Sequence, residues 1–168
     1  MNTILTKQID KQLVGAAGEH LVLSRLLSRG MLAAQAPRGT RKVDILVNHL
    51  EGLRPSLIQV KTCSGTGPNG AWHMSDKHEN VRDEDLFYCF VNLWGDSPSV
   101  HVVPSFRVAD AVSEYYALWL AAPGAKGQPH NDTKMRWIVN NYKLETPSAP
   151  HGWLDEYLEN WGLIEDFK

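Results

Sequence analysis

The sequence is poor in cysteine, has no long apolar run and carries no excess of basic residues, and each shortage excludes a class of protein. Its two cysteines, Cys63 and Cys89, form no CxxC pair, which excludes a disulfide-rich scaffold and a cysteine-ligated zinc site. No stretch has the length of a membrane span, and residues 1–13 lack the apolar centre of a signal peptide. We therefore expect a cytoplasmic protein without membrane association.

Charge, glycine and histidine patterns exclude further classes of function. The formal net charge is −2, so the surface is not uniformly basic and any anionic partner must bind a local patch. The glycine-rich segment SGTGPNG at 64–70 lacks the GK[ST] ending of a nucleotide-binding P-loop. No ligand-like spacing that would indicate a zinc site occurs among His73, His101, His130 and His151.

The chain is long enough for one domain with a full core. It has 168 residues, of which 43% are apolar, as in ordinary globular proteins. We expect a single domain, with a core over about residues 1–122 and a C-terminal elaboration over about residues 123–168.

Local composition predicts the order of helices and strands. The proline-free segment 3–28 predicts one long helix, or two joined near Gly15 and Gly18, and Gly30 should end it. The other expected elements are strands over 31–36, 43–47, 56–62, 86–94 and 99–103, a helix over 104–120, a strand over 135–139 and an amphipathic helix over 151–161.

The segment VDILVNHLEGLRPSLIQVKT, residues 43–62, places three polar side chains inside two apolar strands. Alternate residues of a strand share a face, so Gln59 and Lys61 point the same way. The turn-rich centre of the segment joins the two strands as a hairpin. Antiparallel pairing then places Asp44 opposite Lys61, or opposite Gln59 in a register shifted by two residues. Both registers bring the three side chains together.

A fourth polar side chain, Glu19, lies on the expected first helix and shares a helical face with Gly15 and Leu26. A glycine inside a helix costs about 1 kcal/mol relative to alanine. Gly15 and Gly18 therefore indicate close approach to another backbone, which we expect to be that of the sheet. Such packing would carry Glu19 to the strand site.

These residue types suit a hard divalent cation that acts on a phosphodiester. Magnesium binds one or two carboxylates plus carbonyl oxygens and waters, and it lowers the pKa of a bound water. Asp44 would be the central ligand of Mg²⁺ or Mn²⁺. Gln59 and the backbone carbonyl of Val60 would supply neutral oxygens, and Glu19 would bind directly or through a water. Lys61 would orient the attacking water or neutralise charge that develops on the phosphate.

The order Glu19, Asp44, then Gln59-Val60-Lys61 resembles the PD-(D/E)xK nuclease superfamily, whose core occurs in restriction endonucleases and Holliday-junction resolvases. The resemblance covers roughly the first half of the chain. It implies an α/β fold with a central mixed sheet flanked by helices, a helical C-terminal elaboration, and a magnesium-dependent nuclease site.

Two positions depart from that motif, because Val43 stands in place of its proline and Gln59 in place of its usual acidic residue. Proline is often absent in the superfamily, so Val43 has little consequence. The amide of Gln59 removes a negative charge from the metal site and should weaken magnesium binding, a loss that Glu19 can offset.

Two functions are compatible with this pattern. The first is a metal-dependent nuclease that hydrolyses DNA or, as the alternative substrate, RNA. A homodimer would be the form that cuts two strands. The second is a module that Gln59 has disabled and that binds nucleic acid or a protein partner without cleavage. Converging carboxylates at Asp44 and Glu19 that face an open cleft favour the enzyme, whereas a salt bridge sealed under a loop favours the second function.

Basic residues close to Asp44 in the sequence form a candidate nucleic-acid-binding track. Local basic groups of this kind bind a phosphate backbone even where the net charge of the whole chain is negative. The track would comprise Arg38, Arg41, Lys42 and Lys77, with His78 and Arg82 as extensions.

Tryptophans in the second half of the chain are able to stack on bases. Their expected helix and strand contexts favour packing or a dimer contact instead. They are Trp119, Trp137, Trp153 and Trp161.

Overall fold

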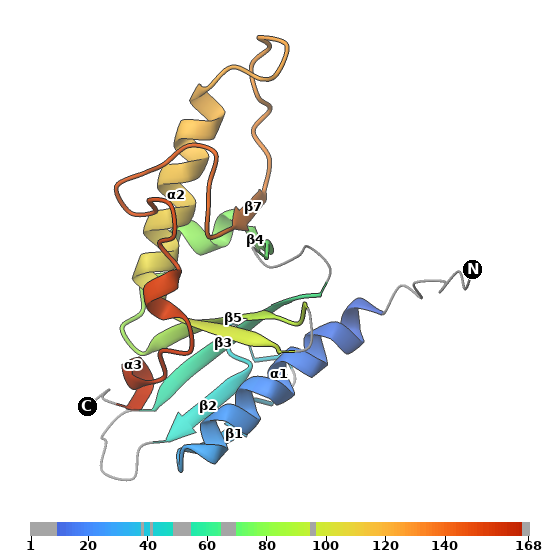
Figure 1. Ribbon diagram of the computed structural model, residues 1–168, viewed down its shortest axis with the longest axis vertical. Helices are drawn as coiled ribbons and strands as arrows, with labels where there is room; N and C mark the ends of the chain where they lie inside the picture. The colour runs from blue at the N-terminus through green and yellow to red at the C-terminus, as the bar shows by residue number, and fades with distance from the viewer. Residues whose placement is uncertain are drawn as a thin grey trace.

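The computed structural model describes residues 10–37, 39–40, 42–48, 55–64, 70–94 and 97–165. A five-stranded sheet in the order β1-β2-β3-β5-β6 forms the centre of the molecule (Figure 1). Its strands are β1 (Leu32–Gln35), β2 (Ile45–Asn48), β3 (Ser56–Cys63), β5 (Leu86–Asn92) and β6 (Ser99–Pro104). β3 and β5 are parallel, whereas the other neighbours are antiparallel. The expected α/β fold with a mixed central sheet is confirmed.

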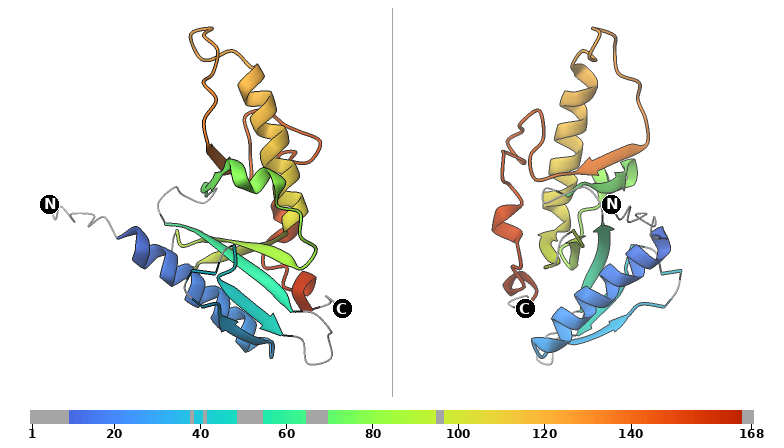
Figure 2. Two further views of the ribbon diagram at one scale, coloured as in Figure 1. Left: turned by 180° about the vertical axis from the view of Figure 1, so that it is seen from behind. Right: turned by 45° about the vertical axis from the view of Figure 1, so that its right-hand side comes forward.

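Helices pack on this sheet from two sides. α1 (Lys11–Ser28) lies along one face, where Leu26 is buried together with Ile58. α2 (Ser105–Ala121) contributes Val108 to a second apolar cluster that contains Tyr88. β5 is buried at every position because side chains cover both of its faces. Figure 2 shows α1 along the sheet and α2 extending away from it.

The first helix is continuous and has defined ends. The Asp10 side chain accepts a hydrogen bond from the backbone N–H of Gln12 (2.7 Å) and caps the N-terminus. At the other end Gly30 has φ +79°, and the N–H groups of Gly30 and Met31 bond the carbonyls of Leu27 and Leu26. Glycine favours this left-handed closing turn, so the expected stop at Gly30 is confirmed. Expected helical residues 3–9 lie outside the described part of the chain.

A two-stranded sheet and a short 3₁₀ helix form a second lobe beside α2 (Figure 1). β4 (Trp72–Ser75) pairs with β7 (Met135–Ile138), and η1 (Asp76–Asn80) directly follows β4. The strand at β7 was expected and is confirmed. β4 was not expected, because its four residues have little periodicity of their own and gain their partner from far along the chain.

The expected amphipathic helix over 151–161 is wrong. The chain there forms turns, a short 3₁₀ helix η2 (Asp155–Tyr157) and an isolated bridge from Leu158 to His101, and only α3 (Gly162–Glu165) follows as a helix. Apolar spacing did identify buried side chains, but backbone N–H groups of this segment bond to other parts of the chain instead of forming helical turns. Those of Gly152 and Glu159, for example, donate to the carbonyls of Asn140 (3.2 Å) and Val100 (2.7 Å). Among the described residues no helix has the length and apolarity needed to cross a bilayer.

Candidate functional site

The hairpin of β2 and β3 realises the second of the two expected registers. Ile45 pairs with Ile58 and Leu46 with Leu57, so one step further Asp44 lies opposite Gln59. The Asp44 N–H donates to the Ile58 carbonyl at 2.8 Å, which extends the pairing to Asp44 itself. The expected proximity of Asp44 and Gln59 is therefore present.

Backbone groups of the sheet fix the Asp44 side chain. Its Oδ2 accepts a hydrogen bond from the Val60 N–H at 2.7 Å, and its own carbonyl accepts one from Ala36 at 2.8 Å. Oδ1 of Asp44 accepts no hydrogen bond from another described residue, which leaves it available for a ligand. The β2–β3 ladder ends at the Ile45–Ile58 pair, so Val60 lies where β3 continues past its partner strand.

Gln59 carries an amide oxygen without a partner. Ile58 and Val60 belong to the cluster packed under α1, so Gln59 and Lys61 point to the opposite face of the sheet. Gln59 Oε1 is buried, yet no hydrogen-bond donor reaches it from the described residues. A buried acceptor left unsatisfied costs about 1–3 kcal/mol. Such an oxygen therefore suits a bound cation or water.

Lys61 is half-buried on the same face as Gln59. Burial lowers the pKa of its ammonium group, and the nearby Asp44 carboxylate opposes that shift. The two side chains therefore interact electrostatically, as the sequence pattern predicted. With Asp44 and Gln59, Lys61 completes the expected strand constellation.

Gly18 sets how closely α1 approaches the sheet. A methyl group at Gly18 would lie 1.9 Å from Thr62 Oγ1 on β3 and 2.9 Å from Thr62 Cβ, a spacing that no alanine tolerates without movement. The expected contact between helix and sheet is thus real at Gly18. At Gly15 no atom lies within 4 Å of the added carbon, so the expectation is wrong there because the helix faces open space.

Glu19 and Asp44 meet in one open pocket of about 510 Å³. Gln35 and Thr40 also line it, as does His20 next to Glu19. Burial raises the pKa of Glu19, the charge of Asp44 raises it further, and His20 partly opposes both effects. Two carboxylates therefore converge on an open cleft, and the charge of Asp44 disfavours the ionisation of Glu19.

These oxygen donors fit a hard divalent cation, and together they carry little negative charge. Within the described ranges no group of three His, Cys, Asp or Glu side chains comes together, so carboxylates alone do not complete a ligand set. Two carboxylates, the unpartnered amide oxygen and carbonyl oxygen at Val60 are the oxygen donors that Mg²⁺ and Mn²⁺ accept, with water filling other positions.

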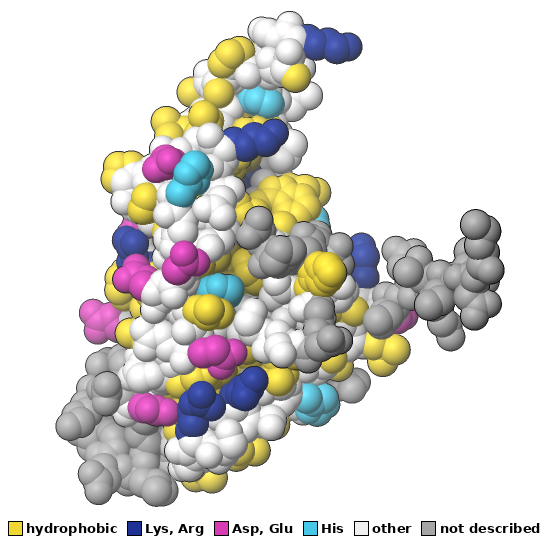
Figure 3. Space-filling view, viewed as in Figure 1, with side chains coloured by type: hydrophobic (Ala, Val, Ile, Leu, Met, Phe, Trp, Pro, Cys, Tyr) yellow, Lys and Arg dark blue, Asp and Glu magenta, His cyan; other side chains and the backbone are white. Residues whose placement is uncertain are grey.

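The basic track is only partly visible. Arg38 and Arg41 lie outside the described residues. Lys42 and Lys77 are exposed, whereas Arg82 is engaged by Asp110 at 2.7 Å. On the face in Figure 3, acidic and basic side chains are interspersed, in agreement with the small net charge. Phosphate contacts would therefore depend on a few local cations.

Tyr88 on β5 is a site residue that the sequence did not indicate. It is the register partner of Gln59, and its hydroxyl lies 2.7 Å from Nδ1 of His78. Paired residues of neighbouring strands share a face. The only available signal was the apolar run LFYCFVN, which contains Tyr88. The position of the Tyr88 hydroxyl could be assigned only once the pairing of β3 with β5 was known.

The tryptophans divide into two groups. Trp153 and Trp161 are buried, as the packing interpretation expected.

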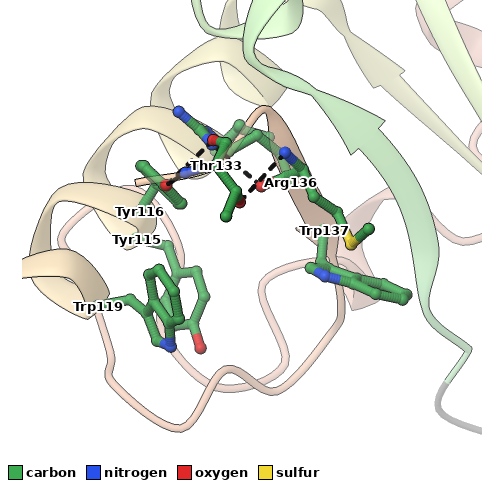
Figure 4. A pocket seen from close by; sticks show the side chains of 8 residues that line it. Tyr115, Tyr116, Trp119, Thr133, Arg136 and Trp137 are labelled. Atoms are coloured by element: carbon green, nitrogen blue, oxygen red, sulfur yellow. Dashed lines mark hydrogen bonds between the residues drawn. The ribbon is translucent and has the colours of Figure 1, made fainter. Parts of the chain in front are cut away.

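Trp119 and Trp137 line a separate pocket of about 240 Å³ between α2 and β7 (Figure 4). Its lining residue Arg136 lies over the Tyr116 ring, 3.1 Å from the centroid, and forms an ion pair with Glu79. No carboxylate is among the described residues that line this pocket.

Comparison with solved structures gives a likeness to a nuclease. The chain is similar to the solved structure of the bacterial homing endonuclease I-Ssp6803I, with a TM-score of 0.50 and 17% identity over 94% of this chain and 93% of that chain. At this identity the likeness shows a shared fold. No protein-family model matches the chain, and no curated protein matches its sequence. Membership of the PD-(D/E)xK superfamily stays a prediction.

The raised pKa of Glu19 predicts a stability effect that depends on pH. Because the pKa in the folded state lies above the ordinary 4.5, ionised Glu19 opposes folding above that raised pKa, and the penalty vanishes below pH 4.5. Glu19→Gln should therefore raise the melting temperature modestly at pH 7 and leave it unchanged near pH 4. Glu84→Gln, at an exposed glutamate outside the pocket, is the control. Equal effects of both variants at pH 7 would contradict the carboxylate pair.

Proposed function

We propose that this protein is a divalent-metal-dependent nuclease that hydrolyses phosphodiester bonds, with DNA as its substrate. The observation that carries the proposal is the convergence of Asp44 and Glu19 on one open pocket. Gln59 lies opposite Asp44 in the strand pairing, and Lys61 is close enough to respond to the charge of Asp44. The fold shared with a homing endonuclease supports DNA as the substrate.

Each side chain has a defined part in that reaction. A divalent cation bound here would polarise a phosphoryl oxygen and lower the pKa of a bound water. Asp44, whose Oδ2 accepts from the Val60 N–H, would offer its other oxygen to the cation. Gln59 and the Val60 carbonyl would add neutral oxygens, and Glu19 would add negative charge from the helix. Lys61 presents its ammonium group to charge that develops on the phosphate.

A non-catalytic nucleic-acid-binding module is the second candidate. The observation that favours it is the lack of a third acidic, histidine or cysteine ligand within the described residues. In that case no cation binds at the carboxylates, and DNA binds through lysines alone.

A cleavage assay separates the two functions. Supercoiled, linear and branched DNA would be incubated with the protein in Mg²⁺, in Mn²⁺ and in EDTA. The nuclease proposal predicts cleavage with a metal and none in EDTA. Binding without cleavage in either metal would instead support the module, and neither binding nor cleavage would exclude both.

Gln59 provides a gain-of-function prediction. Gln59→Glu places a carboxylate beside Asp44. We therefore expect Mg²⁺ binding to be about tenfold tighter for one added ligand charge, and cleavage to be equal or higher. Without metal the same variant should melt at a lower temperature, because two close carboxylates repel each other. Gln59→Leu is the matched control and should lose metal affinity. A Glu variant that is destabilised and gains nothing from metal would identify a structural polar cluster.

A further inference from the structure

His78 is attached to the sheet face that carries the candidate site. It lies on η1, half-buried, with Nδ1 2.7 Å from the Tyr88 hydroxyl and the two rings in an edge contact at 5.6 Å. Tyr88 pairs with Gln59 across β3 and β5. A buried phenol on the sheet therefore holds the His78 imidazole on the same side as Gln59 and Lys61.

Positive charge predominates around His78. Lys61, Lys42 and Lys77 act on the imidazole, and Asp76 alone opposes them. None of the three lysines forms an ion pair within the described part of the chain, whereas other basic residues nearby are neutralised. These are Arg82, paired with Asp110, and Arg136, paired with Glu79. In a chain of net charge −2, a local cluster of unpaired cations is complementary to an anion.

The hydrogen bond to Tyr88 determines which ring nitrogen is available. Tyr88 is fully buried, and among the described residues its hydroxyl has no partner except Nδ1 of His78. If the hydroxyl donates to Nδ1, both groups are satisfied, whereas the opposite direction would leave a buried O–H without an acceptor. Burial also raises the pKa of Tyr88, which keeps the phenol protonated as a donor. Nε2 of His78 then carries the proton and is free to donate.

We propose that Nε2 of His78, held by Tyr88 and flanked by Lys61 and Lys42, contacts a backbone phosphate of the nucleic-acid substrate. His78 is a binding residue in this arrangement, and it forms a phosphate subsite on the sheet face that carries Gln59 and Lys61. The inference rests on the proposed function for the identity of the anion, because a nucleic-acid strand at the carboxylates would bring its phosphates to these cations.

The subsite has a characteristic dependence on pH. Burial and the charges of Lys61, Lys42 and Lys77 lower the pKa of His78 to about 4, although Asp76 opposes them, so the free protein holds a neutral imidazole at pH 7. A phosphate beside Nε2 raises that pKa. Binding therefore takes up a proton at Nδ1, since Nε2 already carries one, and the Tyr88 hydroxyl turns to accept from it at a cost that the phosphate contact offsets. Affinity should rise as the pH falls from the pKa of the complex towards that of the free protein. A histidine with only a structural role would not show this linkage.

Fluorescence anisotropy with a labelled DNA duplex of about 20 base pairs, in EDTA to prevent cleavage, measures the linkage. For the wild type we expect affinity about tenfold higher at about pH 5.5 than at about pH 8. His78→Gln keeps a donor but does not titrate, so its affinity should change far less with pH. Tyr88→Phe should weaken binding by releasing the ring. His130→Gln, in a distant loop, is the control and should retain the wild-type slope.

The outcomes separate this inference from the nuclease proposal. Wild-type and His78→Gln curves with the same pH slope would overturn the phosphate subsite, even if the protein cleaves DNA with metal. A slope that His78→Gln removes would support the subsite even if no metal supports cleavage. Absence of binding at every pH would overturn both. Melting curves of each variant show whether a loss of binding reflects loss of the fold, and proton uptake measured calorimetrically in two buffers checks the slope in the wild type.

Discussion

Asp44→Asn is expected to reduce metal-dependent DNA cleavage by more than about 100-fold while the protein stays folded. A residue that merely supports a metal ligand is worth about 10- to 100-fold in affinity or activity, so loss of a ligand charge should exceed that range. Asparagine is nearly isosteric and retains an oxygen that accepts the Val60 N–H. The melting temperature without metal should therefore not fall, and it should rise if repulsion with Glu19 is relieved.

The matched control is Asp132→Asn. Asp132 accepts a hydrogen bond from the Tyr116 hydroxyl at 2.8 Å on the far lobe, and asparagine retains that acceptor too. Cleavage by this variant should equal that of the wild type. Comparable activities of the two variants would remove Asp44 from the reaction and with it the assigned site.

The largest expected effect on stability belongs to Gly18→Ala. The new methyl group would overlap Thr62 Oγ1 at 1.9 Å, so α1 must shift away from β3. Overpacking of this kind costs about 1–3 kcal/mol, which corresponds to a fall in melting temperature of about 3–10 °C for a chain of this size. Because Glu19 is the next residue, metal affinity should fall as well. Thermal unfolding followed by circular dichroism measures the first effect.

Gly15→Ala, three residues earlier on the same helix, is the control. Nothing lies within 4 Å of its added methyl group, so the gain in helix propensity of about 1 kcal/mol should raise the melting temperature. Thr62→Ala in the Gly18→Ala background should restore part of the loss, because it removes the overlapping hydroxyl. Equal changes at positions 15 and 18 would show that α1 does not pack as described.

Local sequence patterns predicted most of the central sheet and the constellation on it. The alternation that put Gln59 and Lys61 on one face needs only the geometry of a strand, and the hairpin joined them to Asp44. The register was left open between two values because it depends on side-chain packing against α1 as well as on the turn. Glu19 was found through Gly18, since a helix interior tolerates such a costly residue only where another segment approaches.

The parts that could not be predicted depend on partners distant in the chain. β4 pairs with β7 across some sixty residues, and neither segment alone indicates that pairing. Trp153, Tyr157 and Trp161 have helical spacing and are buried, but a different backbone buries them. The same limit applies to Tyr88, whose place beside Gln59 requires the parallel pairing of β3 with β5.

Calorimetric titration of Mn²⁺ into the wild type and into Asp44→Ala tests the proposed metal site itself, because it measures ligand binding independently of any substrate. We expect the wild type to bind the metal with an affinity that rises with pH, as Glu19 loses the proton favoured by its raised pKa. We expect no measurable binding to Asp44→Ala at the same concentrations. Metal binding of equal strength in both proteins, or none in the wild type, would show that Asp44 is not a metal ligand.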